Sequence, residues 1–196
     1  MTPDSNKNKH AYLKIIVSVF ALLVYFSFFF YTHPIGDDFV NSSSVIKNGV
    51  LQTCNDLFFG WSGRYSSNLI LSLNPMVLGS YLGYQFSLIL VLLHLLLSFY
   101  WLTRLLYKDS SKINLVSISL IFSLVYITIL PSISHGIYWF GGSLTYTGKQ
   151  SILNYIGVLV LMMRKNESSF SQNIYSCILI LLAILIIGFN EVSLVF

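Results

Sequence analysis

The sequence is poor in charge: Asp, Glu, Lys and Arg make up 9% of its 196 residues, against about 25% in soluble domains. Hydrophobic residues make up 55%, and the mean hydropathy is +0.73. A chain with so few charged side chains cannot cover a water-exposed surface, which excludes an ordinary soluble domain. The composition indicates an integral membrane protein whose first partner is the lipid bilayer.

The small number of cysteines and the lack of a basic face exclude other classes of protein. The chain has only two cysteines, Cys54 in a polar segment and Cys177 in an apolar run, so neither a disulfide framework nor a cysteine metal site is expected. The formal net charge is +4, but no basic face with interleaved aromatic residues occurs, and the cations lie between apolar runs. Nucleic acid is therefore not expected as a partner.

Long apolar runs predict an all-α, multi-pass transmembrane fold in a single domain, residues 1–196. A helix needs about 20 apolar residues to cross the bilayer. The first run is not a removable signal peptide, because bulky aromatic residues and Pro34 follow it in place of a small-residue cleavage site. The five predicted spans are residues 12–32, 84–106, 113–130, 149–163 and 174–189.

The segment between the first two spans is too polar to cross the bilayer and too apolar for a loop in water. Its apolar residues recur among serines and asparagines at mixed helical spacing. This pattern predicts two short juxtamembrane helices in the membrane interface, near residues 39–48 and 63–73. Because Pro75 and Gly79 interrupt the run 69–82, we expect an interfacial or re-entrant segment there.

The distribution of Lys and Arg predicts the orientation. With a cytoplasmic N-terminus, the inside segments hold Lys7, Lys9, Lys14, Arg104, Lys108, Lys112, Arg164 and Lys165, and the outside holds Lys47, Arg64 and Lys149. The positive-inside rule therefore favours a cytoplasmic N-terminus, in a bacterial inner membrane. The groups that would then share the outer face are Asp37, Asp38, Asp56, Arg64, His135, Lys149 and Glu191.

The first outer segment carries an acidic pair, Asp37 and Asp38, and after a spacer the residues Trp61 and Arg64. Charged groups beside a bilayer are costly and often serve a function. In an extended segment the two carboxylates would point in opposite directions, so one would face a substrate. The alternative is that the pair only caps the following helix.

The second outer segment, 133–148, contains Tyr138, Trp139 and two adjacent glycines, and Lys149 follows it. Aromatic rings can stack on a sugar, and a lysine can hold a phosphate. An aromatic belt at the membrane interface is the alternative for the two rings. Glu191, after the last span, is expected either to line the site or to cap a helix.

The order of these motifs, Gly36-Asp37-Asp38-Phe39, Trp61-Ser62-Gly63-Arg64-Tyr65, Tyr138-Trp139-Phe140-Gly141-Gly142 and Asn190-Glu191, resembles that of a family of uncharacterised bacterial multi-pass membrane proteins. That family is similar in plan to the GT-C glycosyltransferases. The resemblance implies transfer of a sugar from a polyprenyl-phosphate donor to a glycan, lipid or protein acceptor on the outer face. GT-C enzymes usually carry more helices, so the chain is expected to be the N-terminal part of a longer protein.

The resemblance also implies roles for single residues. Asp37 would be the general base, and Asp38 would orient the loop by bonding amides of the following helix. Arg64 and Lys149 would bind the departing phosphate, with Trp61, Tyr138, Trp139 and Glu191 in the substrate site. Some GT-C members use a divalent metal with the acidic loop, but no further carboxylate is spaced for one in this sequence.

A non-catalytic membrane protein, such as a transporter, flippase component or assembly partner, is the alternative function. Transporters tend to place polar groups and broken helices at the bilayer midplane. In this sequence the charged residues lie at the ends of the spans, and His94 with scattered serines occurs within them. We expect His94 to contact a neighbouring helix. The distribution therefore favours chemistry at the outer face.

Overall fold

A computed structural model describes residues 3–164 and 168–189. Within these ranges the regular structure is entirely helical, which confirms the all-α prediction. Four helices are long and apolar enough to cross a membrane. They are α1 (Pro3–Phe28, extended by η1, Phe29–Tyr31), α5 (Tyr81–Leu106), α6 (Lys112–Ile129) and α9 (Ser169–Ile187).

The fourth predicted span, residues 149–163, is only partly as expected. Its helix α8 (Lys149–Met163) has 15 residues, fewer than the about 20 needed to span. However, α7 (Phe140–Ser143) and the π-helix η4 (Leu144–Gly148) precede it without a break, so residues 140–163 form one helical run. The predicted loop 133–148 is thus largely helical. Its glycines permit close packing, since a Cβ at Gly142 would overlap the carbonyl oxygen of His135.

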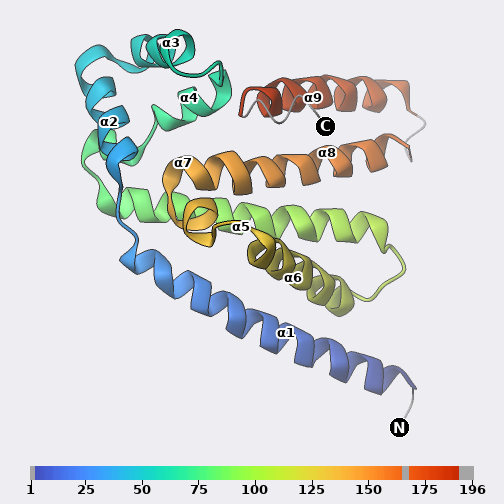
Figure 1. Ribbon diagram of the computed structural model, residues 1–196. Coiled ribbons are helices and arrows are strands. Elements are labelled where there is room, and N and C mark those ends of the chain that lie inside the picture. Colours follow the sequence, from blue (N-terminus) through green and yellow to red (C-terminus); the bar gives the residue numbers. More distant parts are fainter. Residues whose placement is uncertain (1–2, 165–167, 190–196) are drawn as a thin grey trace.

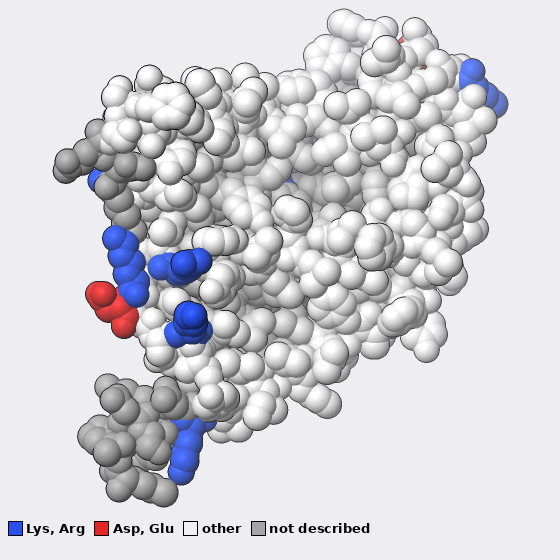
Figure 2. Space-filling view, turned by 180° about the vertical axis from the view of Figure 1, so that it is seen from behind, with Lys and Arg blue, Asp and Glu red and all other residues white. Residues whose placement is uncertain are grey.

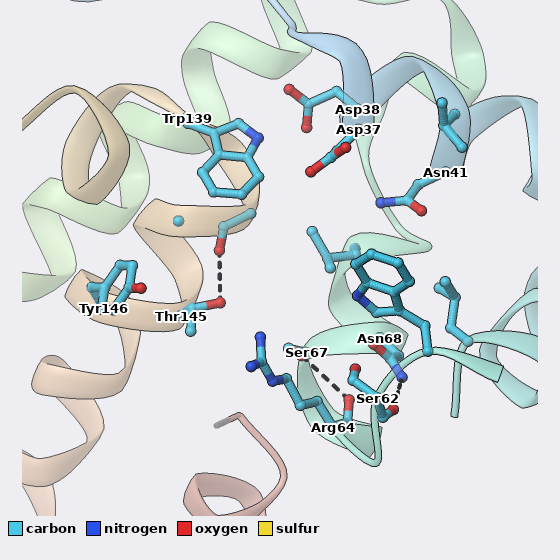
Figure 3. A pocket seen from close by; sticks show the side chains of 16 residues that line it. Asp37, Asp38, Asn41, Ser62, Arg64, Ser67, Asn68, Trp139, Thr145 and Tyr146 are labelled. Carbon is cyan, nitrogen blue, oxygen red and sulfur yellow. Dashed lines mark hydrogen bonds between the residues drawn. The ribbon is translucent and has the colours of Figure 1, made fainter. Parts of the chain in front are cut away.

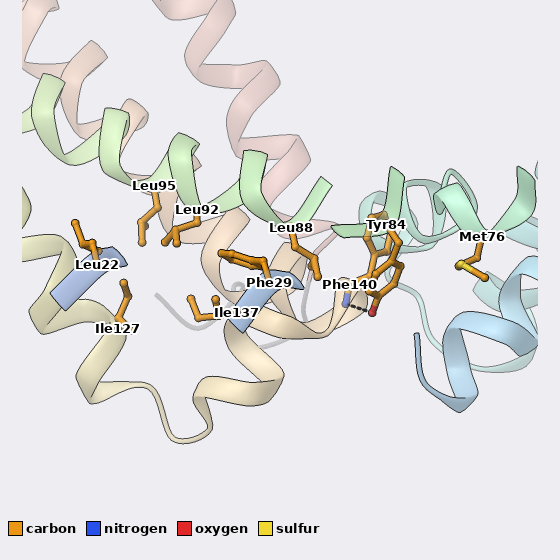
Figure 4. Packing of buried hydrophobic residues seen from close by; sticks show 10 residues of the cluster. All are labelled: Leu22, Phe29, Met76, Tyr84, Leu88, Leu92, Leu95, Ile127, Ile137 and Phe140. Atoms are coloured by element: carbon orange, nitrogen blue, oxygen red, sulfur yellow. Dashed lines mark hydrogen bonds between the residues drawn. The ribbon is translucent and has the colours of Figure 1, made fainter. Parts of the chain in front are cut away.

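The long helices lie side by side, and those that follow one another in the sequence run antiparallel (Figure 1). Helix α5 packs against α6 and α8, α1 packs against α6, and α9 packs against α8. Leu88, Leu92 and Leu95 of α5 form the centre of the buried core, where they meet Phe29 and Ile127 (Figure 4). In the most apolar stretch of α9, only 6% of the residues are buried against the rest of the protein, as expected for a helix surrounded by lipid.

The segment between α1 and α5 forms a cap at one end of the long helices (Figure 1). The cap consists of α2 (Gly36–Asn48), α3 (Val50–Gly60), α4 (Tyr65–Leu71) and the 3₁₀ turn η2 (Pro75–Leu78). Two short helices were predicted in this segment, and the structure has three, because the prediction missed α3. Gly49, with φ of 80°, ends α2 and begins α3 at once, so no polar linker marks the boundary.

The segment 69–82 is the one expected to be interfacial or re-entrant. It consists of the end of α4, the turn η2 and the start of α5. Asn74 caps η2, because its Oδ1 accepts a hydrogen bond of 3.0 Å from the backbone N–H of Met76. Pro75 fits the first position of the turn, where no N–H is needed.

Basic side chains gather at the end of the long helices opposite the cap (Figure 2). They come from the start of α1, the α5–α6 connection and the end of α8: Lys9, Lys14, Arg104, Lys108, Lys112 and Arg164. The face between the two ends is almost uncharged in the same view. A band of this kind suits the hydrocarbon core of a bilayer.

Polar contacts between α5 and α8 lie within the helical bundle. Asn154 donates a hydrogen bond of 3.0 Å to the hydroxyl of Ser98, and both side chains are buried. The ring of His94 meets Tyr155 edge to face, with centroids 5.9 Å apart. His94 therefore contacts a neighbouring helix, as expected.

We predict that Asn154→Ala lowers the free energy of unfolding by about 0.5–1.5 kcal/mol, because an interhelical hydrogen bond in the bilayer is lost. The measurement is reversible unfolding in bicelles. Leu153→Ala is the control, since Leu153 is 42% exposed on the same helix. An equal loss in both variants would contradict a specific contribution from the Asn154–Ser98 bond.

Candidate functional site

A pocket of about 340 Å³ lies between the cap and the helical run 140–163. This volume is within the usual range for small-molecule sites. Both walls come from segments far apart in sequence, and the view in Figure 3 shows their side chains converging. Of the sequence-predicted site residues, the pocket brings together Asp37, Asp38, Trp61, Arg64 and Trp139.

The acidic pair lies in the first turn of α2, not in an extended segment as predicted. Its two members occupy different environments. Asp38 is 1% exposed, whereas Asp37 is exposed and lines the pocket. The separation of roles therefore arises from successive positions on a helix, about 100° apart, and not from the alternation of a strand.

Asp38 is held by three hydrogen-bond donors. Its Oδ1 accepts from Nδ2 of Asn74 at 3.0 Å, and its Oδ2 accepts from the Tyr84 hydroxyl at 2.9 Å and from the backbone N–H of Ile35 at 3.0 Å. Burial raises the pKa of Asp38, and the three donors oppose this effect by favouring the carboxylate. Asp38 thus caps α2 and ties it to η2 and α5.

Tyr84 connects the two walls of the pocket. This fully buried residue of α5 donates its hydroxyl proton to Asp38, and the same oxygen accepts from the backbone N–H of Phe140 at 3.2 Å. The rings of Tyr84 and Phe140 also pack together, with centroids 5.9 Å apart. One phenol therefore fixes the start of α2 relative to the start of α7.

The opposite side of the pocket is built around the N-terminus of α4. Arg64 occupies the N-cap position, and its guanidinium projects toward Thr145 in Figure 3. Asn68, one turn later, donates to the carbonyl of Ser62 at 3.1 Å. The carbonyl of Gly188, at the end of α9, accepts from the backbone N–H groups of Ser66 at 3.0 Å and Ser67 at 3.2 Å. The last helix therefore holds the Arg64 segment in place.

Trp139 is the extended residue between the π-helix η3 (Ser134–Tyr138) and α7. Its neighbour Tyr138 points elsewhere: the Tyr138 hydroxyl donates to the carbonyl of Tyr25 at 2.9 Å, and its ring meets Phe29 at 5.1 Å. Tyr138 is thus placed in the packing against α1 and not in the pocket lining.

Lys149 is not among the residues that line the pocket. Lys149 begins α8, four residues after the pocket residue Thr145. It therefore lies about one turn further along the helical run. Glu191 is outside the residues that the structure describes.

The sequence did not single out six polar residues of the lining: Asn41, Ser62, Ser67, Asn68, Thr145 and Tyr146. A signal existed for two of them. Asn41 follows Asp37 by four residues, and Asn68 follows Arg64 by four, which is the spacing of neighbours on one helix face. That signal is usable only once both segments are known to be helical.

Two carboxylates line the pocket as possible ligands for a divalent metal. They belong to Asp37 and Asp38, and both oxygens of Asp38 already accept protein hydrogen bonds. In residues 3–164 and 168–189, no three His, Cys, Asp or Glu residues cluster as metal ligands would.

Comparisons with protein-family models, with curated proteins and with solved structures find no match. The chemistry of the pocket is therefore the basis on which a function can be assigned.

We predict that Asp38→Asn lowers the free energy of unfolding by about 1.5–3 kcal/mol, because the new amide replaces one acceptor oxygen and at least one charge-assisted hydrogen bond is lost. Asp37→Asn, at an exposed position, should change it by less than about 0.5 kcal/mol. Equilibrium unfolding in detergent micelles measures both. Equal effects would contradict the structural separation of the two carboxylates.

Proposed function

We propose that the protein is a membrane glycosyltransferase of the GT-C kind, which transfers a sugar from a polyprenyl-phosphate donor to a hydroxyl of a cell-envelope acceptor. The observation that carries the proposal is the pocket itself, which has the exposed carboxylate of Asp37 on its α2 side and the guanidinium of Arg64 on its α4 side (Figure 3). Such a pair can serve both ends of a glycosyl transfer.

The transfer would be a single displacement. The acceptor hydroxyl oxygen forms the new bond to the anomeric carbon while its proton passes to the carboxylate of Asp37. The bond from the anomeric carbon to the phosphate oxygen breaks, and the polyprenyl phosphate leaves with the electron pair. Arg64 stabilises the charge on the departing phosphate through its forked N–H groups. Attack from the opposite side inverts the anomeric configuration.

The indole rings of Trp61 and Trp139 lie on different elements and both line the pocket. Aromatic faces of this kind support binding of a sugar ring, and the amides of Asn41 and Asn68 supply donors and acceptors for its hydroxyls. Lys149 adds positive charge about one helical turn beyond the lining residue Thr145.

The charge distribution supports an N-terminus in the cytoplasm of a bacterial cell. The basic end of the long helices would face the cytoplasm, and the cap and pocket would face outward. Polyprenyl-phosphate sugars are consumed on that outer face, so the orientation and the reaction agree.

The orientation predicts opposite labelling of two introduced cysteines. In a Cys54→Ser, Cys177→Ser background, a membrane-impermeant thiol reagent on intact cells should label Asn48→Cys, at the exposed end of α2, and should not label Asp109→Cys, in the exposed α5–α6 connection. Opening the membrane should expose the second site. The reverse pattern would place the pocket in the cytoplasm and contradict the proposed donor.

The proposed base predicts the effect of Asp37→Asn on transfer. The amide keeps the size of the side chain but cannot take the proton, so transfer should fall by roughly 10²–10⁴-fold while donor binding is retained. The assay is sugar transfer in proteoliposomes that contain a polyprenyl-phosphate sugar. Asn41→Ala is a control in the same helix and pocket, and should cost far less in rate. Unchanged transfer by folded Asp37→Asn protein would remove Asp37 from catalysis.

A further inference from the structure

The indole nitrogen of Trp139 is a buried hydrogen-bond donor without a partner. Within the described ranges, the other two unpaired buried side-chain atoms are the hydroxyls of Ser42 and Thr53, in the cap helices α2 and α3. Neither of these residues lines the pocket, whereas Trp139 does. Buried donors are nearly always paired, so an unpaired donor at a pocket wall points to a group that the ligand supplies.

The position of this donor limits what the group can be. Figure 3 shows the nitrogen on the side of the Trp139 ring that is turned toward Asp37 and Asp38. Asp38 already receives three protein donors. An oxygen atom that reaches both Trp139 and Asp37 would accept from the indole N–H and donate to the Asp37 carboxylate.

A neutral hydroxyl satisfies both requirements, because it carries one donor and two acceptor sites. A phosphate dianion does not: it has no proton to donate to Asp37, and the two negative charges would repel each other. The phosphate therefore fits the Arg64 side of the pocket, and the hydroxyl fits the Asp37 side.

We propose that Trp139 and Asp37 together form a subsite for the acceptor hydroxyl, with the indole N–H holding the oxygen while Asp37 receives its proton. The proposal rests on the glycosyl-transfer function above and assigns the two substrates to opposite sides of one pocket. Trp139 binds the acceptor in this arrangement, and Trp61, three residues before Arg64 in the sequence, lines the pocket from the cap.

The experiment uses the indole N–H groups as reporters. The chain has three tryptophans, so ¹⁵N-indole labelling in lipid nanodiscs gives three resonances, which Trp61→Phe, Trp101→Phe and Trp139→Phe assign. Methyl β-glucoside is the probe for a neutral hydroxyl compound, and farnesyl phosphate is the probe for a prenyl phosphate. We expect the glucoside to move the Trp139 N–H proton to higher frequency, as formation of a hydrogen bond does, and farnesyl phosphate to leave it in place.

Trp139→Phe keeps an aromatic ring but removes the donor. Followed through the Trp61 resonance, it should weaken binding of the glucoside by about five- to tenfold and leave binding of farnesyl phosphate unchanged. Trp101→Phe, on α5 and outside the pocket lining, is the matched control and should change neither.

The outcomes separate the two proposals. If the wild-type protein transfers sugar but the glucoside does not move the Trp139 resonance, or if Trp139→Phe weakens farnesyl phosphate instead, the hydroxyl subsite is wrong and the transferase function stands. If the wild-type protein transfers no sugar from a polyprenyl-phosphate donor and binds neither probe, both are wrong. The subsite is supported if the glucoside shifts the Trp139 N–H resonance, farnesyl phosphate does not, and the shift is lost in Asp37→Ala, which lacks the second hydrogen-bonding group.

Discussion

The structure around the pocket depends on one buried phenol. The hydroxyl of Tyr84 bonds a carboxylate of the cap and a backbone N–H of the helical run, and all three groups are shielded from water. In such surroundings an unpaired donor or acceptor costs much more than a hydrogen bond between the same groups contributes. The cap cannot shift from the run 140–163 without breaking at least one of these bonds, so the pocket between them has a defined shape before any ligand arrives.

The same constraint explains why two adjacent acids are not redundant. A buried carboxylate is tolerated only when donors surround it, and Asp38 obtains its donors from η2, α5 and the residue before α2. These bonds fix the first turn of α2 and thereby direct the neighbouring Asp37 toward the pocket. Asp38 is thus part of the packing, and Asp37, the base in the proposed reaction, is the more exposed of the two.

The spans were predictable because the length of an apolar run is a local property that the bilayer itself demands. For the pocket residues, the sequence predicted only that they lie on the same side of the membrane. It did not predict that these five line one pocket: Asp37, Asp38, Trp61, Arg64 and Trp139. The partners of Asp38 were not predictable, since Asn74 and Tyr84 are 36 and 46 residues away and no local pattern links them. Pro75 was interpreted as an interruption, whereas Asn74 and Pro75 form the start of the turn η2. Helix α3 was missed because Gly49 joins it directly to α2. The π-helical turns η3 and η4 pack against α5, which is distant in sequence, so no local pattern predicts them.

The placement of polar groups also bears on the choice between catalysis and transport. Polar side chains in the middle of the bundle make contacts between helices, as Asn154 does with Ser98 and His94 does with Tyr155, so their presence is explained by packing. At the cap, packing explains Asp38 but leaves the exposed Asp37 and the donor of Trp139 facing a pocket. A transporter would concentrate such groups near the bilayer midplane. Their position beside the cap therefore favours chemistry at the edge of the membrane, where a lipid-linked donor and a hydroxyl from the water phase can meet.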